Sequence, residues 1–227
     1  MHGTRSVHLG TVSDLDRMSA ALGAAFEEDP VFEWLIRDGS RRPERLVRFF
    51  KLELEHVVLP NGAAWTTDGV AGASLELPPG AWKMPIGLQL AHGREFMRVF
   101  GAGLPRAMAL ITKIERRHLR EPHYYIPAVG VAPQAQGEGL GTALLHATLD
   151  RCDRDGLPAY LEATSRRNVA LYERLGFEHL GEFNLGSSPP LWPMRRRPGP
   201  GRTGSRGSDA AGATMGTAIA ESAAPEN

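Results

Sequence analysis

Apolar and polar residues recur first at strand spacing and then at helical spacing near the start of the chain. Residues 6–10 predict a short strand, and residues 14–27 predict an amphipathic helix. Ser13 and Asp16 have the spacing of a variant capping box at the start of that helix. Pro30 is expected to end it, because proline cannot continue a helical hydrogen-bond ladder.

Two further helical segments flank a predicted hairpin. Residues 44–59 predict a helix, because large apolar side chains recur there every three or four positions. Residues 63–77 predict two strands around the Asp-Gly dipeptide at 68–69, which suits the positive φ angles of a tight turn. Residues 85–120 predict two more helices, separated near 101–105.

Strands and helices alternate in the second half of the chain. A buried strand is predicted over 123–131 and a helix over 139–156. The remaining predicted elements are strands over 158–164, 177–185 and 189–197 and a helix over 168–176. This order predicts one mixed α/β (α+β) domain over residues 1–197. Residues 198–227 are rich in Gly, Ala, Ser and Pro, and we expect them to form a disordered tail.

Composition narrows the classes of protein. The formal net charge is +0 over 227 residues, which argues against a nucleic-acid or membrane-surface protein. The single cysteine, Cys152, excludes an internal disulfide framework, and the eight histidines show no zinc-site spacing, so no metal is expected. No apolar run reaches a membrane span and no signal peptide is apparent, so we expect a cytoplasmic protein, either a monomer or a homodimer.

Glycines stand at every second position where the predicted strand 123–131 leads into the predicted helix 139–156. Gly137, Gly139 and Gly141 lie in the segment QGEGLG. The start of a helix leaves N–H groups unpaired, and glycine lets an anion approach them without meeting a Cβ atom. The segment therefore predicts a loop that binds a phosphate group.

Two common nucleotide-binding loops do not fit this segment. A P-loop requires a lysine before its Ser or Thr, and here Thr142 directly follows Gly141. A dinucleotide-binding fingerprint requires a further glycine three residues after the second, which neither reading frame supplies.

Two segments instead resemble the GNAT acyltransferase superfamily. Gln136 to Gly141 is similar to its Gln/Arg-x-x-Gly-x-Gly/Ala signature, and Asn168 to Phe177 is similar to its Asn-x-x-x-Tyr-x-x-x-Gly-Phe segment. Residues 121–197 resemble the puromycin N-acetyltransferase-like members most. The resemblance implies the GNAT fold, with a central, mixed, mostly antiparallel sheet whose strands splay, flanked by helices. Residues 85–120 are then a helical insertion that shapes the acceptor site.

In that superfamily the glycine loop binds the pyrophosphate of acetyl-CoA, and the strand before it pairs with the pantetheine arm. Val131 is the expected backbone partner of that arm, and a backbone N–H near Val129 is the expected oxyanion donor. Pro127 departs from a regular strand and marks either a strand edge or the bulge where the strands part. The residues that the resemblance assigns to acetyl-CoA are Val129, Val131, Gln136, Gly137, Gly139, Leu140, Gly141, Thr142 and Asn168.

The resemblance also assigns two catalytic residues. Tyr172 matches a tyrosine that protonates the departing thiolate, although a packed tyrosine with its hydroxyl bonded to backbone fits the sequence as well. Glu162 matches a glutamate that acts as general base, directly or through a water, with a solvent-facing glutamate as the alternative. Asn168 is also expected to cap its helix. Tyr124 and Tyr125 fit either an acceptor pocket or simple packing.

These features predict an N-acetyltransferase that transfers the acetyl group of acetyl-CoA directly to a primary amine of a small molecule, antibiotic-like amines included. Two alternatives remain open. Acetylation of a protein N-terminus or lysine would require an open groove instead of a pocket. A coenzyme-binding module without turnover would not need Glu162 or Tyr172.

Overall fold

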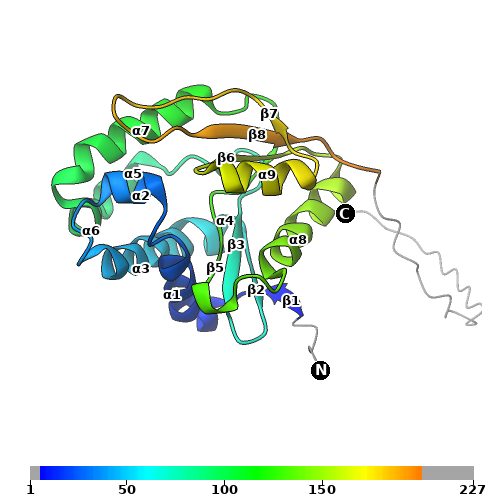
Figure 1. Cartoon of the computed structure of the whole chain (residues 1–227), viewed down its shortest axis with the longest axis horizontal. Helices are drawn as coiled ribbons and strands as arrows, with labels where there is room; N and C mark the ends of the chain where they lie inside the picture. The colour runs from blue at the N-terminus through cyan, green and yellow to red at the C-terminus, as the bar shows by residue number, and fades with distance from the viewer. Residues whose placement is uncertain (1–5, 201–227) are drawn as a thin grey trace, which may run out of the picture.

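The computed structural model describes residues 6–200 (Figure 1). The predicted tail lies outside the described residues, apart from its first three positions. The first half of the chain contains β1 (Val7–Leu9), α1 (Leu15–Ala25), α2 (Pro30–Leu35), α3 (Arg42–Glu53), α4 (Leu59–Asn61), β2 (Ala63–Thr67), β3 (Gly72–Glu76), α5 (Ile86–Ala91), α6 (Gly93–Phe100) and α7 (Leu104–Arg117). The second half contains β4 (Tyr124–Tyr125), β5 (Val129–Val131), α8 (Leu140–Asp155), β6 (Ala159–Ala163), α9 (Arg166–Arg174), β7 (Glu178–His179) and β8 (Trp192–Arg196).

The capping box of the first helix lies two residues earlier than predicted. The capping box is formed by Thr11 and Asp14, whose carboxylate accepts a hydrogen bond from the Thr11 N–H at 3.0 Å. The predicted pair of Ser13 and Asp16 was therefore wrong, because the same spacing of residue types occurs two positions earlier. Pro30 begins α2 instead of ending α1, since proline suits the first turn of a helix, where its missing N–H costs nothing.

The other helices differ from the prediction in where they are interrupted. The helix predicted over 44–59 continues from α3 into a π-helical turn at Leu54–Val58, in which the Leu59 N–H bonds to the Leu54 carbonyl. The segment 85–120 holds three helices instead of two, because a break at His92 adds to the predicted break at 101–103. α8 ends at Gly156, whose φ of 66° gives the left-handed cap that glycine favours.

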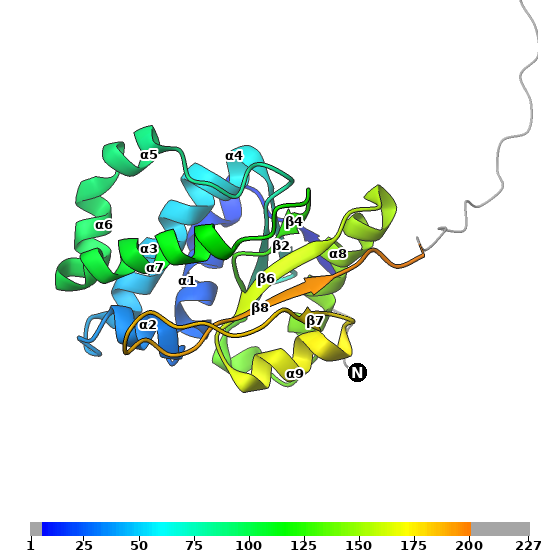
Figure 2. The same cartoon turned by 90° about the horizontal axis from the view of Figure 1, so that it is seen from above.

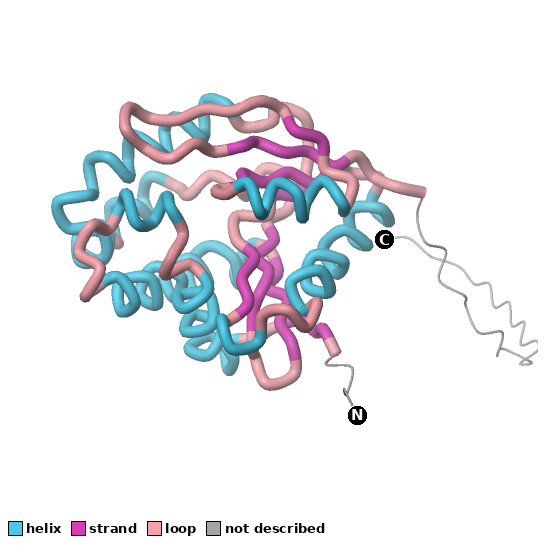
Figure 3. The backbone as a smooth tube through the Cα atoms, in the orientation of Figure 1, coloured by secondary structure: helices cyan, strands magenta, loops and turns pink. Residues whose placement is uncertain are grey.

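Two four-stranded sheets make up the strand layer. One has the order β1-β2-β3-β5 and is antiparallel throughout. The other has the order β4-β6-β8-β7, with only the β4–β6 pair parallel. The strand predicted over 177–185 is reduced to β7 and an isolated bridge between Phe183 and Leu191. Helices flank both sheets, as the GNAT fold requires (Figure 3).

A β-bulge at Pro127 joins the two sheets. On one side Leu77 pairs with Tyr125, and further along Ser74 pairs with Val129. Leu77 lies three residues after Ser74, whereas Val129 lies four residues after Tyr125. One extra residue is therefore accommodated between Tyr125 and Val129. The structure confirms the second interpretation of Pro127, because a proline can stand in a sheet at a bulge, where its missing N–H breaks no ladder.

The bulge changes which residues direct their backbone N–H and C=O groups toward β3 and which direct them toward β6. Before it, the Ile126 N–H bonds to the Tyr160 carbonyl of β6. After it, the Ala128 carbonyl accepts from the Leu75 N–H of β3, so even-numbered residues now face β3. Because antiparallel strands alternate in this way, the N–H groups of Val129 and Val131 are directed away from β3, toward the side where β6 has departed. The two strands therefore splay beyond Ile126.

Helices lie on opposite sides of the splayed strands β5 and β6. α2, α3 and α5–α7 lie together on one side, while α8 and α9 lie on the other, an arrangement that both views show (Figures 1 and 2). The side chains of Leu145, Leu149 and Cys152 on α8 are buried against β6 and β8. No helix among residues 6–200 is long and apolar enough to cross a membrane.

Candidate active site

The glycine loop has the backbone geometry that phosphate binding requires. Gly137 and Gly139 have φ values of 85° and 78°, and a Cβ atom added at either would meet no atom within 4 Å. Both glycines are therefore needed for their backbone conformation, and the space above them is open. Gly141 differs, since it lies inside α8 and its added Cβ would be in ordinary contact with Val131 at 3.7 Å.

The start of α8 presents unpaired N–H groups beside this loop. Its first backbone bond runs from the Ala143 N–H to the Gly139 carbonyl, so the N–H groups of Leu140, Gly141 and Thr142 precede the helical ladder. Gln136 stabilises the loop by donating from Nε2 to the Val131 carbonyl at 3.0 Å. The residues present thus fit a coenzyme pyrophosphate, with the positive end of the helix dipole facing it.

Tyr172 lies on α9, and its side chain is buried in the cluster that α8 and β6 also form. Its ring is buried against Phe177, with centroids 5.7 Å apart. Burial, with a contribution from the charge of Asp29, raises the pKa of its hydroxyl above the ordinary value, which keeps the phenol protonated at neutral pH. Asn168 is not the helix cap that we predicted, because the Ser165 hydroxyl accepts from the Asn168 N–H at 3.2 Å and Ser165 precedes the helix.

Glu162 lies on the opposite face of β6 from the α8 core. Its side chain is 6% exposed, and its Oε2 accepts a hydrogen bond from the Tyr125 hydroxyl at 2.9 Å. Its Oε1 lies 3.7 Å from His118 Nδ1, and both of these atoms are buried with no hydrogen-bond partner in the described part of the chain. His118 Nε2 in turn lies 2.9 Å from His123 Nε2. Glu162 is thus inside the protein and not solvent-facing.

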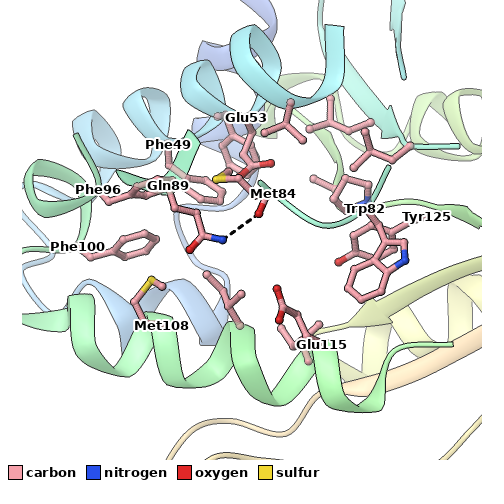
Figure 4. Close-up of a pocket in the computed structure, with 18 of the residues that line it drawn as sticks. Phe49, Glu53, Trp82, Met84, Gln89, Phe96, Phe100, Met108, Glu115 and Tyr125 are labelled. Atoms are coloured by element: carbon pink, nitrogen blue, oxygen red, sulfur yellow. Dashed lines mark hydrogen bonds between the residues drawn. The ribbon is translucent and has the colours of Figure 1, made fainter. Parts of the chain in front are cut away.

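A cavity of about 460 Å³ opens beside this cluster. It lies between α3 and α7, and α5, α6, β3 and the bulged strand complete its walls (Figure 4). Tyr125, Pro127 and Ala128 line its sheet side, and the indole of Trp82 lines it while stacking on His118 with ring centroids 3.7 Å apart. Of the two tyrosines that were expected either to line a pocket or to pack, Tyr125 lines the cavity. The Tyr124 hydroxyl bonds to Asp155 away from the cavity.

One ionisable side chain in this cavity stands out. Glu53, the last residue of α3, is surrounded by apolar side chains, and burial alone raises the pKa of its carboxyl from 4.5 to about 7. The π-helical turn begins at the next residue, and such turns are frequent at functional sites. Figure 4 shows Glu53 and Glu115 projecting toward the space from opposite walls.

Sequence patterns missed Glu53, Trp82 and His118. A signal for Glu53 was present, since it stands four residues after Phe49 and three after Phe50, on the apolar face of its helix. Trp82 and His118 carried no local signal, because only the folding of α7 against the sheet brings them together.

Cys152 takes no part in this arrangement. Burial raises the pKa of the Cys152 thiol to about 12, which leaves it protonated and unreactive. Among residues 6–200 there is no group of three or more His, Cys, Asp or Glu side chains that could hold a metal ion.

Comparisons with known proteins agree with this geometry. Residues 88–177 match the acetyltransferase (GNAT) family. Over 205 residues the chain is 28% identical to an uncharacterised N-acetyltransferase of Schizosaccharomyces pombe, covering 82% of this chain and 80% of that protein. It is 31% identical over 131 residues to the mycothiol acetyltransferase of Acidothermus cellulolyticus, covering 54% of this chain and only 38% of that relative.

A solved structure supports the same conclusion. A Corynebacterium glutamicum protein described as histone acetyltransferase HPA2 and related acetyltransferase superimposes with a TM-score of 0.68 and 26% identity, covering 86% of this chain and 97% of that one. The chain has the same fold as that structure, the GNAT fold, with a splayed sheet and a glycine loop before a helix. Residues 88–177 are the part of the chain that is similar to the GNAT family of acetyltransferases.

Replacing Gly139 tests the loop directly. We expect Gly139→Val to abolish measurable binding of acetyl-CoA in calorimetry, because valine is strained at a φ of 78° and its side chain would fill the space in front of the helix N–H groups. Gly186→Val is the matched control, since Gly186 also has a positive φ of 56° and open space but lies in another loop. Normal affinity in Gly139→Val, or equal loss in both variants, would contradict the assignment.

Proposed function

We propose that this protein transfers the acetyl group of acetyl-CoA directly to a primary amine of a small molecule. The observation that carries the proposal is the cavity of about 460 Å³ that reaches Pro127 and Ala128, at the point where the strands part. Its volume falls in the range of small-molecule sites. A donor held along the splayed strand and an acceptor held in the cavity would therefore meet at the bulge, as direct transfer in a ternary complex requires.

The coenzyme would be held mainly by backbone groups. Gly137 to Thr142 supply the loop and helix start for the pyrophosphate, and Val131 supplies a strand edge for the pantetheine arm. The N–H of Val129, directed away from β3, is our candidate donor to the thioester oxygen as it becomes negative. Bound acetyl-CoA contributes the activated acetyl group, and Asn168, half-buried on α9, is assigned to contact the pantetheine.

Two side chains would manage the protons. Tyr172, kept protonated by burial, is the proposed acid for the departing thiolate. Glu162 is the proposed base, and the structure supports an indirect path, since the Tyr125 hydroxyl lines the cavity and donates to Glu162. The amine proton would pass to the Tyr125 oxygen as the phenol gives its own proton to Glu162, so that Tyr125 ends the step neutral.

The names of relatives leave the acceptor open. The Corynebacterium glutamicum structure is described as histone acetyltransferase HPA2 and related acetyltransferase, and the Acidothermus cellulolyticus relative is described as a mycothiol acetyltransferase. We favour a small acceptor over a protein, because α5–α7 wall the cavity and leave apolar side chains, not an extended groove, next to the bulge. From the motifs in residues 121–197, we propose that the chain is most similar to the puromycin N-acetyltransferase-like members of that family.

An assay of free CoA release tests the proposed function. The purified chain is incubated with acetyl-CoA and a panel of arylalkylamines, polyamines, aminoglycosides, puromycin-like nucleosides and N-terminal peptides. We expect release with small primary amines and none with peptides. Release with peptides alone would favour the protein-acetylating alternative, and no release with any amine would favour a module without turnover.

Tyr172→Phe tests the acid. We expect kcat to fall by about 10²-fold or more, the usual contribution of a positioned general acid, while the dissociation constant of acetyl-CoA changes little. Phenylalanine keeps the packing against Phe177, so the fold is preserved. The control is Tyr124→Phe, which removes a hydroxyl bonded to Asp155 outside the cavity. An unchanged kcat in Tyr172→Phe would remove this residue from the mechanism.

A further inference from the structure

The cavity has a lining that is apolar and aromatic almost throughout. Six phenylalanines contribute to it together with Trp82 and Tyr125, and aliphatic side chains and methionines fill the rest. Its phenylalanines are Phe26, Phe32, Phe49, Phe50, Phe96 and Phe100. A ligand that fills this space must therefore have a hydrocarbon or aromatic body, because a sugar or peptide would leave its polar groups without partners.

The charges on the cavity wall have a single sign. Glu53 and Glu115 are its two carboxyl groups, and no lysine or arginine stands among the described residues that line it. The amide of Gln89 is already used, since its Nε2 donates to the Met84 carbonyl at 2.9 Å. The wall thus favours a cationic ligand and disfavours an anionic one.

Glu53 is the carboxyl that the protein leaves without compensation. Among the described residues Glu53 forms no hydrogen bond or ion pair, and burial raises the pKa of its carboxyl to about 7. In Figure 4 it projects into the same space as the aromatic rings. A buried carboxylate without a partner is costly, and a ligand ammonium would remove that cost.

The position of Glu53 connects the cavity to the reacting end. Glu53 and Tyr125 line the same cavity, and the charge of Glu53 adds, after burial and Glu162, to the causes that raise the pKa of the Tyr125 hydroxyl. An ammonium group beside Glu53 would therefore lie in the same cavity as the Tyr125 side chain, with the phenylalanines around it to receive the apolar body.

We infer that the acceptor is a primary amine on an apolar aromatic or alkyl skeleton, which enters as an ammonium ion paired with Glu53. Its skeleton packs among the phenylalanines, and aromatic faces add a cation–π attraction for the charged end. The binding step stands on the cavity alone. For the chemistry that follows, the inference rests on the proposed function: the ammonium gives one proton to the Glu53 carboxylate and becomes the neutral amine, and the second proton passes through Tyr125 to Glu162 during transfer. Amines carrying a carboxylate or many hydroxyl groups are excluded by the same wall.

Calorimetric binding at about pH 8, without acetyl-CoA, tests the inference. At that pH most Glu53 is ionised and an alkylamine is still protonated. The probes are 2-phenylethylamine, the uncharged 2-phenylethanol and the polar ethanolamine. We expect 2-phenylethylamine to bind at least about tenfold more tightly than either of the others, because it alone satisfies both the carboxylate and the aromatic wall.

The Glu53→Gln variant removes the carboxylate charge and keeps the shape of the site. We expect this variant to lose about tenfold or more in affinity for 2-phenylethylamine and to keep its affinity for 2-phenylethanol. Glu55→Gln is the matched control, since Glu55 stands two residues further along the chain and is exposed, outside the cavity lining. Equal binding of ethanolamine and 2-phenylethylamine, or an unchanged affinity in Glu53→Gln, would overturn the inference.

Thermal unfolding tests whether the Glu53 carboxyl is uncompensated, and it does so even if no probe binds. A group whose pKa is raised on folding costs stability as pH rises from its unfolded value of 4.5 through about 7. Glu53→Gln should therefore raise the Tm at pH 8 and leave it unchanged at about pH 4, with Glu55→Gln showing neither effect. The other titratable groups that face this space are Tyr125, Glu115 and His118, and they are present in every variant. An equal Tm at pH 8 would contradict an uncompensated Glu53.

The two proposals fail in different ways. If 2-phenylethylamine binds through Glu53 but no CoA is released, the cavity is a binding site for apolar ammonium ions, and the proposed function falls. If CoA is released only with polar amines such as ethanolamine, the acetyltransferase function holds and this inference falls.

Discussion

One extra residue at Pro127 determines the layout of this protein. It shifts the register between Leu77 and Ser74 on one strand and Tyr125 and Val129 on the other, and thereby turns the backbone groups of Val129 away from β3. Because β6 diverges at the same point, those groups face no strand of the sheet. An unpaired strand edge inside a protein is costly unless something pairs with it, and an extended pantetheine arm is such a partner.

The bulge also separates two chemically different spaces. On the α8 side the groups are backbone N–H donors around Gly137 and Gly139, which suit a phosphate. On the side of α3 and α7 the groups are aromatic rings and the carboxyl of Glu53, which suit an apolar cation. Tyr125 stands between the two, hydrogen-bonded to Glu162 and exposed to the cavity. Donor and acceptor can therefore be recognised independently and still meet at one strand.

Sequence alone predicted the parts whose signal is local. The glycine loop, the strand before it and the helix that carries Tyr172 follow from residues close together in the chain, and the left-handed φ values of Gly137 and Gly139 explain why glycines stand there. Asn168 was misjudged as a cap because Ser165, three residues earlier, competes for the same role. Glu53, Trp82 and His118 were not found, since the cavity forms only when α3 and α7, some 50 residues apart by their bounds, fold over the same sheet.

Residue-resolved amide hydrogen exchange, with and without coenzyme A, tests the central role of the bulge. Gly130 pairs with Ala73 of β3, so its N–H should be protected in both states. The N–H groups of Val129 and Val131 should exchange faster in the free protein and slow by about tenfold or more when coenzyme A binds. If Val129 and Val131 exchange as slowly as Gly130 in the free protein, or do not respond to coenzyme A, the splayed strand is not the coenzyme's partner and the account is wrong.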